Sequence, residues 1–129
     1  MSHESFGSLQ VTPAAFDRLV HRAVATLPPQ FKRWMENVVI AVQEEASEDL
    51  LDELEADELL GVYLGVPLTE RHPDDPYQLP DQILLFRGPL VRACDTLEEL
   101  EEEVRITVVH EVGHFFGLSE EEIVEVLGP

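Results

Sequence analysis

The segment His110-Glu-Val-Gly-His-Phe-Phe-Gly-Leu-Ser-Glu120 decides how this chain is interpreted. On a helix, His110 and His114 lie one turn apart, so both imidazoles can reach one metal ion from the same face. Glu111 lies about 60° around the helix axis from His114, where it can act as a general base on a water molecule at an open metal position. The segment therefore predicts a zinc site with hydrolase chemistry, and the alternative is a surface helix with two incidental histidines.

A third ligand requires the helix to end soon after His114. On a continuing helix Glu120 would lie about 9 Å beyond His114, whereas a metal-bound donor lies about 2 Å from the ion. Gly117 can adopt a positive φ just after the helix, and this would reverse the chain and return Glu120 to the two histidines. Three other carboxylates remain alternative third ligands, namely Glu121, Glu122 and Glu125.

With these residues the chain resembles the small bacterial zincin-like metallopeptidases, whose pattern is HExxHxxG followed, after two further residues, by Asp, Glu or His. Three other stretches look like the same family: Phe16-Asp-Arg-Leu-Val20 with Thr26-Leu-Pro-Pro29, then Leu60 to Arg71, then Leu79 to Pro89. The resemblance implies that His110, His114 and Glu120 bind zinc and that Glu111 is the catalytic base. It also implies an α+β fold, a minimal zincin-like domain with a small sheet of three or four strands packed on an N-terminal helix and the HExxH helix.

Length and charge limit the possible functions. At 129 residues and 44% hydrophobic, residues 1–129 suit one domain with one core, and residues 1–11, which show no periodicity, are expected to be a flexible tail. A net charge of -19, from 27 acidic and 8 basic residues, opposes binding to nucleic acid and to anionic membranes. We hypothesise that acid near the cleft favours positively charged peptides, and equal cleavage of matched Lys-rich and Glu-rich peptides would contradict this.

The expected compartment is the cytoplasm. Residues 1–10 are polar, and no apolar run approaches the roughly 18 residues that span a bilayer. Cys94 is the single cysteine, which excludes an intrachain disulfide. Cys94 is interpreted as a small buried hydrophobe, and the alternative is a thiolate that caps the zinc ion.

Local patterns predict the order of the elements. Thr12 and Pro13 should start a helix that ends before Pro28, and Thr96 or Asp95 should cap the HExxH helix. Segment 44–58 is expected to be a loop with some helix, and segment 67–81 an irregular excursion that forms a cleft wall. The expected strands and remaining helices are strands at 38–42, 61–66 and 82–87, the HExxH helix at 96–116, and a short helix after Ser119.

The flanking Pro80 and Gly88-Pro89 suggest that strand 82–87 lies at the edge of the sheet. An extended peptide could then pair with it, and Ile83, Leu85 and Arg87 are the predicted substrate-binding residues. The oxyanion of the reaction also needs a donor beyond the metal. Four side chains are candidates for that donor, namely Arg87, His72, Tyr63 and Tyr77.

The predicted activity is that of a zinc metallopeptidase, an endopeptidase acting on peptides or unfolded proteins. Zinc would lower the pKa of a bound water toward about 7, and Glu111 would accept its proton and pass it to the leaving amine. Two alternatives stay open. One is a zinc-binding interaction module without turnover, and the other is a zinc hydrolase that acts on a non-peptide substrate. The oligomeric state is not predicted.

Overall fold

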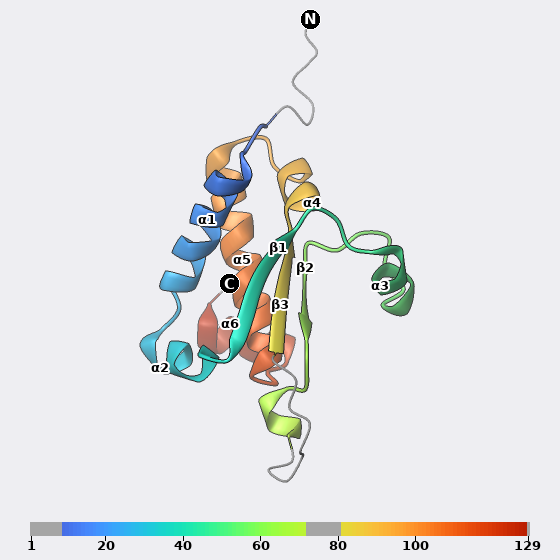
Figure 1. Cartoon of the computed structure of the whole chain (residues 1–129). Coiled ribbons are helices and arrows are strands. Elements are labelled where there is room, and N and C mark those ends of the chain that lie inside the picture. The colour runs from blue at the N-terminus through green and yellow to red at the C-terminus, as the bar shows by residue number, and fades with distance from the viewer. Residues whose placement is uncertain (1–8, 72–80, 129) are drawn as a thin grey trace, which may run out of the picture.

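The computed structural model describes residues 9–71 and 81–128, which form an α+β fold (Figure 1). A three-stranded mixed sheet consists of β1 (Val38–Gln43), β2 (Gly61–Leu64) and β3 (Asp81–Phe86). The described residues also form six α-helices, namely α1 (Pro13–Ala25), α2 (Pro29–Lys32), α3 (Glu48–Glu53), α4 (Arg87–Arg92), α5 (Leu97–Phe115) and α6 (Glu120–Leu127). Two short 3-10 helices are η1 (Arg33–Met35) and η2 (Leu68–Glu70). This agrees with the fold class that the sequence predicts.

The central strand of the sheet is β3, so the prediction of an edge strand at 82–87 is wrong. The strand order is β1-β3-β2, with β3 parallel to β1 and antiparallel to β2. Pro89 lies in the first turn of α4, where a backbone N–H has no helical partner and proline costs nothing. Pro89 therefore marks the start of α4 after the strand, and the edges of the described sheet are β1 and β2.

The core lies between the sheet and the two long helices. In Figure 1, α1 and α5 lie together against the sheet, and α3 stands apart from them, beyond β2. Ile83 and Leu85 of β3 are completely buried within this core, so the prediction that they bind substrate is wrong. Their neighbours include the buried stripe of α1 and the buried stripe of α5, namely Phe16, Leu19, Val20, Leu100, Val104 and Val108.

The N-terminal helix begins as the sequence predicts. The Thr12 hydroxyl accepts a hydrogen bond from the Ala15 N–H at 3.1 Å, and Pro13 is the first helical residue. The prediction of a flexible tail over residues 1–11 includes too many residues, because Val11 is buried and its carbonyl accepts a hydrogen bond from Arg87 Nη1 at 2.6 Å. Residues 1–8 lie outside the described part of the chain.

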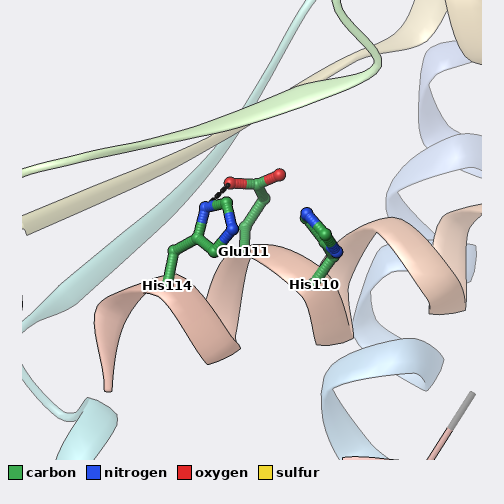
Figure 2. A group of neighbouring side chains, drawn as sticks. All are labelled: His110, Glu111 and His114. Atoms are coloured by element: carbon green, nitrogen blue, oxygen red, sulfur yellow. Dashed lines mark ion pairs between the residues drawn. The ribbon is translucent and has the colours of Figure 1, made fainter. Parts of the chain in front are cut away.

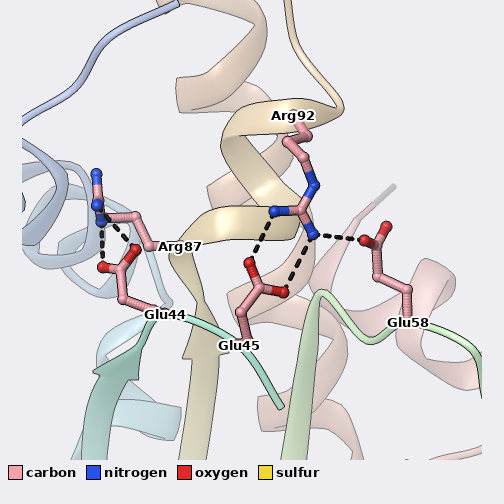
Figure 3. A network of polar contacts seen from close by, with 5 residues as sticks. All are labelled: Glu44, Glu45, Glu58, Arg87 and Arg92. Atoms are coloured by element: carbon pink, nitrogen blue, oxygen red, sulfur yellow. Dashed lines mark hydrogen bonds and ion pairs between the residues drawn. The ribbon is translucent and has the colours of Figure 1, made fainter.

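Two arginines of α4 fasten the connection between β1 and β2 (Figure 3). Arg87 binds both carboxylate oxygens of Glu44, at 2.5 and 2.8 Å, and Arg92 joins Glu45 to Glu58 with contacts of 2.7 Å each. Arg87 thus starts α4 rather than continuing the strand, and its guanidinium is engaged in structure. The predictions of Arg87 as a substrate-binding residue and as an oxyanion donor are therefore wrong.

None of the helices in residues 9–71 and 81–128 combines the length and apolar character needed to cross a membrane.

Candidate active site

The HExxH helix is the longest element, and its start is firmly capped. The Thr96 hydroxyl accepts from the Glu99 N–H, and the Glu99 carboxylate accepts from the Thr96 N–H, each at 3.1 Å. The two histidines lie in the last two turns of α5, near the C-terminus, where the helix dipole favours a cation. The two histidines, which are candidate metal ligands, therefore lie at the end of α5 that favours a cation.

Gly117 ends α5 in the predicted way. Its φ is 76°, its N–H donates to the His114 carbonyl, and the Leu118 N–H donates to the Gly113 carbonyl, both at 3.0 Å. This pair of bonds is the Schellman motif, which needs a left-handed residue after the helix C-cap. The predicted chain reversal is confirmed.

The reversed chain starts α6 at once. The Ser119 hydroxyl accepts from the Glu122 N–H at 3.2 Å, and the Glu122 carboxylate accepts from the Ser119 N–H at 2.9 Å. Hydrogen bonding of the Glu122 carboxylate to Ser119, above all to its main-chain N–H, holds the pKa of Glu122 below its usual value. Glu122 is therefore a capping residue, which leaves Glu120, the first residue of α6, free to turn toward α5.

Glu120 lies beside both histidines. Its Oε1 is 3.3 Å from His110 Nε2 and 3.5 Å from His114 Nε2. Zinc ligands at about 2.0–2.2 Å in a tetrahedron are separated from one another by about 3.3–3.5 Å. Among the described residues of α6, only Glu120 has a carboxylate within 4 Å of either imidazole. The two distances from Glu120 Oε1 lie in this range, which makes Glu120 a candidate third ligand beside His110 and His114.

Glu111 lies next to the two histidines on α5, and its carboxylate contacts the His114 ring (Figure 2). Its Oε1 is 3.5 Å from His114 Nδ1, and the side chains of His110, Glu111 and His114 also form a group whose possible ligand atoms lie within 4.8 Å of one another. We favour Glu120 over Glu111 as third ligand, because one Glu120 oxygen meets both Nε2 atoms, whereas Glu111 meets the Nδ1 face of one ring. Glu111 then stands next to the metal position.

Burial distinguishes the two carboxylates. The Glu120 side chain is 70% exposed, but that of Glu111 is 10% exposed. Burial raises the pKa of Glu111, and the neighbouring His114 and His110 and a hydrogen bond from the Tyr63 main chain oppose this. The main-chain amide of Tyr63 thus ties Glu111 to strand β2.

Pairing in the sheet explains why that amide is available. The Phe86 N–H donates to the Leu60 carbonyl at 2.9 Å, and antiparallel pairs alternate between bonded and non-bonded positions. The main-chain groups of residues 62 and 64 therefore face β3, while those of Gly61 and Tyr63 face the open edge. The Glu111 carboxylate accepts a hydrogen bond from one of these outward-facing groups, the main-chain amide of Tyr63.

A buried polar network fixes the side chain of Tyr63, and sequence reasoning missed two of its members. The Tyr63 hydroxyl donates to Asp81 Oδ1 at 2.7 Å, and Arg71 donates to the other oxygen of this buried carboxylate. Arg71 also donates to the Val66 carbonyl at 2.8 Å and lies over the Phe115 ring, 5.6 Å from its centroid. Residues 71 and 81 belong to no common sequence motif. Their side chains meet only in the folded protein, so no pattern in the sequence signals this contact.

Of the proposed oxyanion donors in the described part of the chain, only Tyr63 lies beside the site. Burial and the hydrogen bond to Asp81 raise the pKa of Tyr63 to about 12, so its hydroxyl is protonated at neutral pH. Arg87 lies at the opposite end of β3 from Asp81, about 20 Å away along the strand. His72 and Tyr77 lie outside the described residues.

Cys94 is buried, as predicted, and burial raises the pKa of its thiol. It precedes the start of α5, whereas His110 lies 13 residues beyond Leu97, a helical distance of about 20 Å. The alternative of a zinc-capping thiolate is therefore wrong.

Comparison with known proteins adds two findings. The family model described as zincin-like metallopeptidase matches residues 35–127, which include all four residues of the candidate site. Among solved structures, the chain is similar to a conserved hypothetical protein from Thermo thermophilus, with 29% identity, a TM-score of 0.56, and coverage of 82% of this chain and 94% of that one. No curated protein matches the chain.

Proposed function

The chain belongs to the zincin-like metallopeptidase family, and from that premise we propose that it is a zinc-dependent endopeptidase with Glu111 as its general base. The observation that carries this proposal is the arrangement of the two carboxylates. Glu120 shares one oxygen between His110 Nε2 and His114 Nε2, and Glu111 is buried beside them on the outward-facing amide of β2.

His110, His114 and Glu120 would hold the metal ion. When bound, zinc supplies Lewis-acid chemistry, in that it polarises a carbonyl and makes a water molecule acidic enough to lose a proton at neutral pH. The two imidazoles and the carboxylate of this set are ligand types that suit zinc, and the partial exposure of the histidine side chains, 38% and 40%, gives a substrate access.

Glu111 would accept the proton of the attacking water and return it to the leaving amine. The Tyr63 N–H restricts the orientation of this carboxylate, and its burial excludes bulk water from one side. Precise placement of a base contributes to rate because the proton must be within hydrogen-bonding distance when the bond changes.

The substrate would lie along β2 rather than along the buried β3. Within the described residues, β2 is an edge strand, and its outward-facing carbonyls at Gly61 and Tyr63 can accept from an extended peptide. Glu111 reaches the same edge, so a peptide that pairs there brings its backbone to the base. Main-chain pairing makes few demands on sequence, which suits an endopeptidase acting on peptides or unfolded proteins.

Glu111→Gln tests the role of the base, with Glu121→Gln as a matched control on exposed α6. We expect Glu111→Gln to retain one zinc per chain and to lose peptide cleavage by about 10²–10⁴-fold, while Glu121→Gln retains both. Wild-type protein that binds zinc but cleaves no member of a peptide library would reject the proposal and leave a zinc-binding interaction module. Hydrolysis of esters without hydrolysis of peptides would instead indicate a non-peptide hydrolase.

A further inference from the structure

A small hollow borders the metal site on the side of the Gly117 turn. Its volume is about 330 Å³, and His114 forms part of its wall. Tyr63, Gly65, Pro67 and Glu70 line it from β2 and the segment that follows, and the turn after α5 closes it. This volume is at the lower end for ligand pockets, which suits one side chain of a longer ligand.

Glu70 gives this hollow its charge. Among the described residues of the wall, it is the only carboxylate, and neither lysine nor arginine lies there. Within residues 9–71 and 81–128, Glu70 forms no ion pair, and the adjacent Arg71 is turned away to the buried Asp81. The negative charge of Glu70 is therefore not neutralised by this part of the protein.

The position of Glu70 is fixed by its two neighbours in sequence. Thr69 packs against Gly117 so closely that a Cβ at Gly117 would collide with the Thr69 hydroxyl. On the other side, Arg71 is bound to Asp81 and to the Val66 carbonyl. Anchors on both sides hold the backbone of the short helix η2 in place, so that Glu70 stays in the wall of the hollow.

We propose that this hollow receives a lysine or arginine side chain of the substrate, next to the bond that is cleaved, and that Glu70 pairs with its cation. This inference rests on the proposed peptidase function, because it assigns a substrate preference to the same site. An exposed ion pair contributes about 0.2–1 kcal/mol, so the expected preference for a basic over a neutral residue is at most about fivefold in kcat/KM.

The test uses quenched fluorescent peptides that differ only at one residue flanking the cleaved bond, which is Lys, Gln or Glu. Wild type should prefer Lys over Gln and Gln over Glu. Glu70→Gln should bring the Lys to Gln ratio close to one, and Glu70→Lys should reverse the order. Zinc content is measured for every variant, and product masses identify the cleaved bond.

Glu53→Gln, an exposed carboxylate on α3, is the control for the overall field of the protein, because it changes the net charge by the same amount. It should leave the wild-type preference unchanged. A preference for Lys that survives Glu70→Gln, or that falls equally in Glu53→Gln, would overturn the inference and assign the preference to the net charge. Absence of cleavage of all three peptides by wild type would instead contradict the proposed peptidase function itself.

Discussion

Gly117→Ala is expected to lower the free energy of unfolding by about 2–5 kcal/mol. The φ of Gly117 is 76°, and a residue with a Cβ in this region costs about 1–2 kcal/mol. The new Cβ would also collide with the Thr69 hydroxyl and lie 2.9 Å from its Cγ2. Overpacking of this kind costs about 1–3 kcal/mol, and the two costs together give the expected range.

Two further variants serve as controls for these costs. Gly128 also has a positive φ, 89°, but its ψ of 167° lies outside the left-handed helical region, and no atom lies within 4 Å of the position that a Cβ would occupy there, so Gly128→Ala is a glycine substitution without a collision and not a measure of the same strain. Thr69→Ala in the Gly117→Ala background should recover about 1–2 kcal/mol, because it removes the colliding atoms. Urea unfolding with a chelator present measures all variants without a contribution from bound metal.

The same substitution should weaken zinc binding, because Gly117 sets the reversal that brings Glu120 to the histidines. We expect the zinc dissociation constant of Gly117→Ala to rise at least about tenfold, which corresponds to about 1.4 kcal/mol. The reasoning would be refuted if Thr69→Ala restored none of the stability lost in Gly117→Ala and if zinc bound Gly117→Ala as tightly as wild type.

Three further predictions concern the metal site and its surroundings. Glu120→Ala should weaken zinc binding at least about tenfold by calorimetry, whereas Glu122→Ala should only remove a cap and cost about 1 kcal/mol of stability; equal zinc affinity in both would exclude Glu120 as a ligand. In a Tyr77→Phe background, the ultraviolet absorbance of Tyr63 should show that its hydroxyl titrates near pH 12. Because folding raises the pKa of Tyr63 from 10 to about 12, the stability that its protonated hydroxyl contributes is fully present below pH 10 and is lost as the pH rises to about 12. A midpoint near pH 10 in folded protein would contradict this hydrogen-bonded environment. Cys94→Ser should cost about 1–3 kcal/mol by burying a hydroxyl, with zinc content unchanged; loss of zinc would contradict a purely structural thiol.

Local signals were enough to predict the helices that build the site. Caps and glycines act within a few residues, so Thr12, Thr96, Gly117 and Ser119 could be assigned their roles from neighbouring residues alone. The order of the strands depends on contacts between distant segments, and the prolines around β3 were a misleading guide to it. The continuous apolar run Ile83 to Phe86 was the better signal, because a central strand is buried on both faces.

The polar network around Tyr63 could not be predicted for the same reason. Its hydroxyl, the Asp81 carboxylate and the Arg71 guanidinium come from β2, from β3 and from the segment between them. Register in the sheet decides that Tyr63 pairs with Ile83 and that its amide faces the open edge. A one-residue change of register would turn the Tyr63 amide toward β3 and remove the bond to Glu111.

The residues between the ligands of the HExxH segment have structural tasks that explain their identities. Ile123, the buried residue of α6, packs on Gly113 so closely that a Cβ at Gly113 would collide with it. Since α6 also carries Glu120, this contact and the Gly117 turn together decide how the third carboxylate meets the two histidines. A metal bound by all three residues would add a second link between α5 and α6, so its binding free energy would also stabilise the docking of α6. Metal binding by these three residues would therefore be coupled to the packing of α6 on α5.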